Sequence, residues 1–294
     1  SKKNKKYFMK KEYFTSTWLA LREPYDFLSR NKNLKKLIRK SDCILDIGSG
    51  TGGFGRWCIE NDIFFKTMML LDHDQRLLNN SRIYTAKFCK SKKLVIEKIS
   101  KRKFKVEDPV HNLTYGFETI NRDLGLTIDL INNFDVLSMS ALIDLLSIKY
   151  LSNLFNIING NKVIAMTLCF NGKVSWNHKN IHDKYIVNEF NKDQQSIKEG
   201  ELALGYKSIE KVKQLSKKKN FKISIHDSSW KLLSNSHENK KFHMKYLETI
   251  YKPLKRNDQV DNEMLEKWFS SKIKLIDNNS LETTVGHNDI IIQT

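Results

Sequence analysis

Two hydrophobic patterns alternate along the chain. Short apolar stretches rich in β-branched residues are separated by longer stretches in which apolar residues recur every three or four positions. The first pattern is typical of buried strands and the second of amphipathic helices. Their alternation predicts an α/β fold with a doubly wound, mainly parallel sheet and helices on both faces. The seven predicted strands are residues 43–47, 67–71, 117–121, 134–139, 162–169, 221–226 and 281–292.

The helical stretches suggest how the chain is organised. Residues 1–40 are expected to form a basic helical extension with an amphipathic helix at 13–29, and residues 41–294 one domain. An alternating run at 94–99 could form an extra hairpin. Long segments between elements predict insertions at about 90–115, 171–206 and 235–280, the second capping a site. The other predicted helices are 53–61, 74–88, 141–158, 181–198, 208–219, 239–255 and 262–276.

Composition narrows the class of protein. With 40% hydrophobic residues and only 3 Pro and 12 Gly among 294 residues, the chain can bury enough apolar surface to fold, so a disordered or fibrous protein is excluded. No apolar run approaches the ~20 residues of a membrane span, and no secretory signal is expected. The four cysteines lie far apart without a Cys-x-x-Cys pair, which favours a reducing cytoplasm and no zinc ribbon.

The net charge of +18 is concentrated in two segments. Residues 1–41 carry 13 basic and 3 acidic side chains, residues 87–105 carry 9 and 1, and the remainder sums to zero. Such segregation favours a basic surface for an anionic partner such as nucleic acid. Lys outnumbers Arg 42 to 9 in this chain. A solvated lysine-rich tail and loop would therefore give the same charge distribution without an anionic partner.

A glycine-rich turn follows the first predicted strand. Gly48, Gly50 and Gly53 fit the dinucleotide pattern G-x-G-x-x-G, whereas Gly48, Gly50 and Gly52 fit the G-x-G-x-G of methyltransferases. Asp46 distinguishes the two ligands. Its carboxylate would repel the pyrophosphate of a dinucleotide and attract the ammonium and sulfonium of S-adenosylmethionine.

Further acids follow the next strands in order. Asp72 ends the second strand, 24 residues past Gly48, where it can accept hydrogen bonds from both ribose hydroxyls. Asp123, after the third strand, can accept the adenine amino group while Leu124 packs against the ring. The fourth strand leads through Ser138 to the expected position of the methyl group.

With these motifs the chain resembles the class I, Rossmann-like S-adenosylmethionine-dependent methyltransferases over residues 41–170. The resemblance implies a seven-stranded sheet whose last strand is antiparallel, with 281–294 as its counterpart. It also implies S-adenosyl-L-methionine as cofactor. The residues expected to bind the cofactor are Asp46, Gly48, Ser49, Gly50, Gly52, Asp72, His73, Asp123, Leu124 and Ser138.

The sequence indicates the residues that bind the methyl acceptor less clearly than those that bind the cofactor. Methyl transfer from a sulfonium can proceed by positioning and desolvation, with a base needed only for an acceptor that must lose a proton. Cys169 lacks a neighbouring proline and is expected to be a buried strand residue. Arg22 and Glu23 form another possible polar edge. Acceptor-side candidates are Ser140, Asp144, Trp176, His178 and Asn191, with His182, Asp183 and Gln194 nearby and no metal expected.

The sequence favours a cytoplasmic methyltransferase of a small molecule, because the insertions resemble a lid and no RNA-binding module is appended. Two alternatives stay open. One is a tRNA or rRNA methyltransferase that uses the basic segments 1–41 and 87–105, and the other is a non-catalytic module that binds S-adenosylmethionine.

Overall fold

The computed structural model describes residues 15–126, 129–198 and 201–294. Its centre is a ten-stranded sheet in the order β10-β12-β7-β6-β1-β2-β5-β4-β3, with β11 paired to β12, and a separate two-stranded sheet joins β8 and β9. The strands are β1 (Cys43–Ile47), β2 (Thr67–Asp72), β3 (Val95–Lys98), β4 (Lys103–Asp108), β5 (Leu113–Asn121), β6 (Val136–Ser140), β7 (Val163–Trp176), β8 (Ile197–Lys198), β9 (Glu201–Leu202), β10 (Lys222–Asp227), β11 (Trp230–Leu232) and β12 (Thr283–Gln293).

Five central strands, β7, β6, β1, β2 and β5, run parallel. The last strand, β12, lies antiparallel between β7 and β10. The doubly wound sheet with an antiparallel last strand is the Rossmann-like arrangement that the resemblance implies, so the expected fold class is confirmed.

All seven predicted strands are present, and the sheet contains three more, β3, β4 and β11. The alternating run at 94–99 does form a hairpin strand, β3, but its partner β4 then joins the edge of the main sheet beside β5. β11 adds three more residues against β12. β4 and β11 were missed because β4 is lysine-rich and β11 is short, and their pairing is decided by the neighbouring strand rather than by their own pattern.

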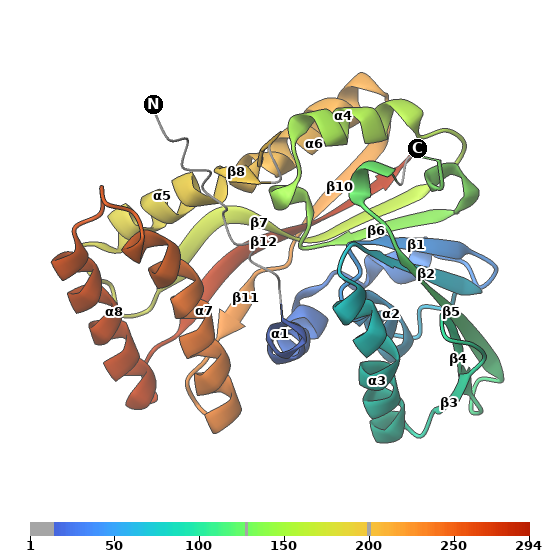
Figure 1. Cartoon of the computed structure of the whole chain (residues 1–294), viewed down its shortest axis with the longest axis horizontal. Coiled ribbons are helices and arrows are strands. Elements are labelled where there is room, and N and C mark those ends of the chain that lie inside the picture. Colours follow the sequence, from blue (N-terminus) through green and yellow to red (C-terminus); the bar gives the residue numbers. More distant parts are fainter. Residues whose placement is uncertain (1–14, 127–128, 199–200) are drawn as a thin grey trace, which may run out of the picture.

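Helices cover both faces of the sheet (Figure 1). α2 and α3 pack on one face and α4 and α6 on the other, while α5, α7 and α8 surround the far ends of β7 and β12. None of the helices in the described ranges is long and apolar enough to cross a membrane. The α-helices are α1 (Ser16–Ser29), α2 (Gly53–Glu60), α3 (Gln75–Lys92), α4 (Ile148–Ile157), α5 (Asp183–Gln194), α6 (Ser208–Lys218), α7 (His237–Lys255) and α8 (Asn262–Asp277).

One predicted helix begins later than expected. α4 starts at Ile148 rather than at residue 141, because Ser147 caps its N-terminus by accepting a hydrogen bond from the Tyr150 amide. The preceding Ala141 has a left-handed φ of 48°, which a helix does not tolerate. The chain between them instead forms a short 3₁₀ turn that holds Asp144 at the end of β6.

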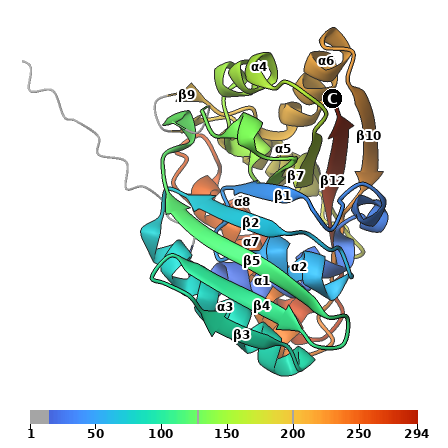
Figure 2. The same ribbon diagram turned by 90° about the vertical axis from the view of Figure 1, so that its right-hand side faces the viewer.

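The extra length of β7 and β12 separates two regions. In β7, Thr167 lies opposite the end of β6 at Ser140, and the strand continues nine residues further to Trp176. At about 3.3 Å per residue, Trp176 lies roughly 30 Å further along the strand. Trp176 and Trp268 lie there in an apolar cluster that extends back to Phe242, which stacks on Tyr25 of α1. Figure 2 shows the opposite edge, where the β3–β4 hairpin lies beyond β2 and β5.

Candidate functional site

The glycine turn connects β1 to α2 at the carboxyl edge of the parallel strands. Gly48, Gly50 and Gly52 have φ of 68°, 55° and 80°, a left-handed backbone that glycine adopts without steric cost. The Gly50 amide donates to Asp72 Oδ2 over 2.8 Å. Asp72, at the end of β2, therefore fixes the shape of the turn as well as facing the site.

Asp72 is 5% exposed and already accepts two backbone hydrogen bonds, from Gly50 and from the Asp74 amide at 2.8 Å. Burial raises its pKa, and the two amides oppose that shift. Each oxygen keeps a second lone pair, so the carboxylate can still accept from ribose hydroxyls. The His73 ring lies 3.5 Å from Asp72 Oδ1 and is exposed.

Asp46 lies in β1, directly opposite Ser138 of β6 in the strand register. Ser138 Oγ donates to Asp46 Oδ1 over 2.7 Å, whereas Asp46 Oδ2 is buried without a hydrogen-bond partner among the described residues. Burial raises the pKa of Asp46 to about 7, against the hydrogen bond from Ser138. The buried hydroxyl of Ser49, in the turn, also lacks a partner in the part of the chain that is described.

Unpaired buried polar atoms are costly, and proteins normally give them a partner. Asp46 Oδ2 and Ser49 Oγ are thus suited to a ligand that brings hydrogen-bond donors and positive charge to the turn. The predicted residues Asp46, Ser49, Asp72 and Ser138 come together at this edge, as the sequence predicts.

The adenine-side residues follow the neighbouring strand β5. Asn121 ends this strand and donates through its side-chain amide to the carbonyls of Asp72 and His73, which joins the ends of β5 and β2. Asp123, two residues further on, is exposed, and Leu124 packs partly against the apolar core. Both therefore lie near the end of β2, at the same edge as the turn.

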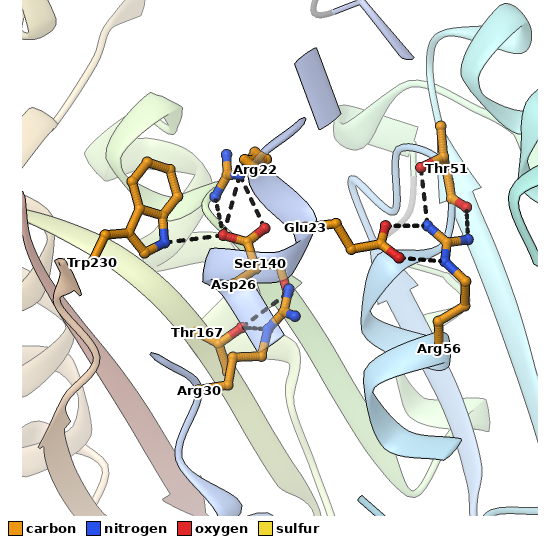
Figure 3. A network of polar contacts seen from close by, with 9 residues as sticks. All are labelled: Arg22, Glu23, Asp26, Arg30, Thr51, Arg56, Ser140, Thr167 and Trp230. Atoms are coloured by element: carbon orange, nitrogen blue, oxygen red, sulfur yellow. Dashed lines mark hydrogen bonds and ion pairs between the residues drawn. The ribbon is translucent and has the colours of Figure 1, made fainter. Parts of the chain in front are cut away.

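Helix α1 covers the glycine turn. A Cβ atom built on Gly50 would lie 2.8 Å from Leu19 Cδ1, so the leucine packs directly on the turn. Glu23 pairs with Arg56 of α2 through two hydrogen bonds of 2.8 and 2.6 Å. Figure 3 shows this contact, in which Arg56 also donates to Thr51 of the turn.

The inner face of α1 is polar, which the sequence analysis only partly anticipated. Arg22 and Glu23 do not pair with each other. Arg22 instead pairs with Asp26 on the same helix at 3.0 Å, and Asp26 also accepts from the Trp230 indole at 3.1 Å. α1 also packs Trp18 and Tyr25 against Phe242 of α7, so the buried polar pair of Arg22 and Asp26 lies beside an apolar contact. A buried polar pair on a helix is unusual and is consistent with a position beside a site.

Arg30, at the end of α1, is a residue that the sequence analysis missed. Its guanidinium is buried and donates to Thr167 Oγ1 at 3.3 Å and to Ser140 Oγ at 3.2 Å (Figure 3). It thereby connects the N-terminal segment to the end of β6 and to Thr167 within β7. No sequence motif marks this residue, because only the fold brings position 30 to positions 140 and 167.

The structure separates the acceptor-side candidates. Ser140 belongs to the site through Arg30 and Thr167, and Asp144 lies in the turn after β6. Trp176 is buried against Trp268, at the far end of β7. No described contact brings the remaining candidates to the glycine turn. His178 and His182 are exposed, and Asp183 binds Trp268 and Lys272. Asn191 donates to the Gly172 carbonyl, and Gln194 lies at the end of α5.

Two further expectations concern cysteines and metals. Cys169 is fully buried, and burial raises its pKa well above the usual range, as expected of a core thiol. The described residues contain no group of three or more His, Cys, Asp or Glu side chains that could hold a metal ion.

Comparison with known proteins gives distant structural likenesses. No protein-family model matches the sequence, and no curated protein sequence is similar to it. A cyclopropane synthase of Mycobacterium tuberculosis is 11% identical, with a TM-score of 0.44 over 90% of this chain and 82% of that one. A phosphoethanolamine N-methyltransferase of Haemonchus contortus, solved with S-adenosylhomocysteine, is 16% identical, with a TM-score of 0.44 over 97% and 59%. A precorrin-6y methyltransferase of Geobacter metallireducens is 9% identical, with a TM-score of 0.39 over 70% and 77%.

Proposed function

We propose that this protein is an S-adenosylmethionine-dependent methyltransferase that acts on a small molecule. The observation that carries the proposal is the buried Asp46 Oδ2 atom, left without a partner in the described structure beneath a glycine turn that Asp72 holds in shape. A carboxylate in this position suits a cationic ligand and disfavours the pyrophosphate of a dinucleotide.

The chain's own residues have separate roles in this proposal. Gly48, Gly50 and Gly52 let the backbone approach the ligand, and Asp46 and Ser49 bind the ammonium of its amino-acid end. Asp72 binds the ribose, and Asp123 and Leu124 bind the adenine. When bound, S-adenosylmethionine supplies a methyl group already activated by a sulfonium. Helix α1, which packs on the turn through Leu19, excludes water from the site.

Two features support a small acceptor over RNA. α1 lies over the glycine turn, which suits a ligand small enough to be enclosed, whereas a polymer needs an open groove. The basic segment 87–105 lies mainly in α3 and the β3–β4 hairpin, at the sheet edge away from β6 and β7. Several of its lysines are also in ion pairs: Lys92 with Glu60, Lys103 with Glu118, and Lys105 with Glu97 and Glu107. Residues 1–14 of the other basic segment lie outside the described residues.

The test has two stages. Titration calorimetry measures binding of S-adenosylhomocysteine and of NAD to the native protein, and only the former is expected to bind. The protein is then incubated with S-adenosylmethionine carrying a labelled methyl group and with a metabolite extract. A single labelled small product supports the proposal. Label in co-purified RNA would favour the RNA alternative, and binding without any labelled product would favour a non-catalytic module.

A further inference from the structure

Three of the five buried Arg and Lys side chains in the described residues are paired with an acid, and a fourth, Lys162, donates to the carbonyls of Asn132 and Phe134. Arg22 pairs with Asp26 at 3.0 Å, Arg56 with Glu23 at 2.6 Å, and Lys272 with Asp183 at 3.0 Å. This is expected, because an uncompensated charge inside a protein is strongly destabilising. Arg30 differs from all three. It is only 5% exposed, yet its hydrogen bonds go to two neutral hydroxyl groups.

One nitrogen of the Arg30 guanidinium has no partner at all in the described chain. Nη1 is fully buried and makes no hydrogen bond, while Nε and Nη2 make long contacts of 3.3 and 3.2 Å. The guanidinium also lies over the rings of Phe54 and Trp57, at 5.8 and 5.7 Å from their centroids. Aromatic faces stabilise the cation and leave its in-plane donors available.

The backbone around Arg30 is firmly held. Its own amide donates to the Asp26 carbonyl at the end of α1. The next amide, of Asn31, donates to the buried carboxylate of Asp289 at 2.7 Å, and the same carboxylate accepts from the Leu168 amide of β7 at 2.8 Å. Arg30 is therefore anchored on both sides before any ligand arrives, which lowers the entropic cost of using it in binding.

The unpaired atoms at this edge have opposite charges. Arg30 Nη1 is a cationic donor, and Asp46 Oδ2 is an anionic acceptor close enough for Arg30 to lower the pKa of Asp46. The two groups make no hydrogen bond to each other in the structure. An α-amino-acid group, with one ammonium and one carboxylate, would satisfy both.

We infer that Arg30 is a ligand-binding residue of this site and that Nη1 binds a carboxylate. The inference rests on the proposed function and deepens it, since nothing in the glycine motif supplies a charged partner for a carboxylate. A guanidinium suits this role because it binds carboxylates through two parallel hydrogen bonds. The carboxylate can belong to the amino-acid end of the methyl donor or to the acceptor, and the experiment separates these sources.

The first arm uses S-adenosylhomocysteine and its decarboxylated analogue, in which hydrogen replaces the α-carboxylate. If Arg30 binds the donor, the native protein should bind the full ligand at least about tenfold more tightly, as expected for a charge-assisted hydrogen bond. In Arg30→Gln the ratio of the two affinities, for the full ligand over the decarboxylated one, should fall to about one. Arg30→Lys should give an intermediate ratio because it keeps the charge but not the planar geometry. Arg82→Gln, at an exposed position of α3, is the matched control and should keep the native ratio.

The affinity ratio is measured within each variant, so a general loosening of the fold weakens the binding of both ligands alike and leaves the ratio unchanged.

The second arm separates the labelled products of a metabolite extract by anion exchange. If Arg30→Gln keeps the native ratio but loses a labelled anionic product, Arg30 binds the acceptor carboxylate. A native ratio together with unchanged anionic product overturns the inference. If the native protein binds neither compound, the proposed function fails and takes the inference with it.

Discussion

The glycine-turn edge and the far ends of β7 and β12 hold buried charged side chains in opposite ways, although the far ends also contain two neutral donors, Tyr246 Oη and Trp176 Nε1, without a partner among the described residues. At the far ends, Lys272 of α8 is held by Asp183 at 3.0 Å and by the His178 carbonyl at 2.8 Å. His243 of α7 lies between Ser234 Oγ and Thr283 Oγ1. At the glycine turn, Asp46 and Arg30 each keep a buried atom without a partner in the described structure.

The difference shows which buried polar groups stabilise the fold and which are suited to a ligand. A satisfied group has used its hydrogen-bonding capacity inside the protein, so its removal should change stability. An unsatisfied group lowers stability in the free protein and gains partners only on binding. Substitutions in the two regions should therefore affect different measurements.

The largest expected effect is on stability at the far end. Asp183→Ala leaves Lys272, whose side chain is 1% exposed, as a buried charge without its acid, and it also removes the acceptor of the Trp268 indole. Removing one member of a buried pair costs about 3 to 5 kcal/mol, which urea denaturation would measure. Glu263→Ala breaks an exposed pair with Lys267 and should change nothing measurable. Equal stability of the two variants would contradict this account of the far end.

The two regions should also respond to acid in opposite directions. Burial lowers the pKa of His243 to about 4, so between pH 6.5 and 4 the unfolded chain takes up a proton that the folded chain does not. Stability present above pH 6.5 is therefore lost as the pH falls. Burial raises the pKa of Asp46 to about 7, so the folded chain takes up the proton first and gains stability as the pH falls through 7.

At about 1.4 kcal/mol per pKa unit, the contribution is on the order of 3 kcal/mol for His243 and 4 kcal/mol for Asp46. Urea denaturation of the native protein, Asp46→Asn and His243→Gln at several pH values between 4 and 7 measures them. Asp46→Asn should lose stability more steeply in acid than the native protein, and His243→Gln less steeply. Parallel curves for all three proteins would show that neither group titrates as the structure indicates.

A smaller effect is expected on binding at the glycine turn. Asp72→Ala should weaken S-adenosylmethionine binding at least tenfold, about 1.4 kcal/mol, because the ribose hydroxyls lose their acceptor and Gly50 loses its anchor. Titration calorimetry measures the affinity, and Asp62→Ala at an exposed ion pair is the control. Unchanged affinity in Asp72→Ala would exclude Asp72 from the site.

The smallest effect should come from the basic hairpin. Replacing the exposed Lys98, Lys101 and Arg102 by Gln should change donor affinity and methyl transfer by less than about twofold, because the β3–β4 hairpin lies at the distant sheet edge. Methyl-transfer rates at low and high salt provide the measurement. A steep loss of rate with salt that the triple variant abolishes would instead favour a nucleic-acid acceptor.

Much of the fold was predictable because its signals are local. The strand at Cys43–Ile47 and the helix after Gly53 follow from an apolar run and a glycine turn, and the structure gives the same start for both. The β3–β4 pair was predictable only in part, because an edge strand with several lysines has a weak pattern. Trp176 was an acceptor-side candidate by residue type alone, and the length of β7 decides that it packs against Trp268.

The sequence by itself determined the α/β class and the order of Asp46, the glycines, Asp72 and Asp123, since these depend on neighbours within a few residues. Tertiary structure alone decided that Leu19 and Glu23 cover the turn, and that Arg30 meets Ser140 and Thr167 more than a hundred positions away. The physical reason is that a buried charged side chain produces no periodic pattern in the residues around it in the sequence. Whether it is paired depends on which distant strands the fold brings beside it.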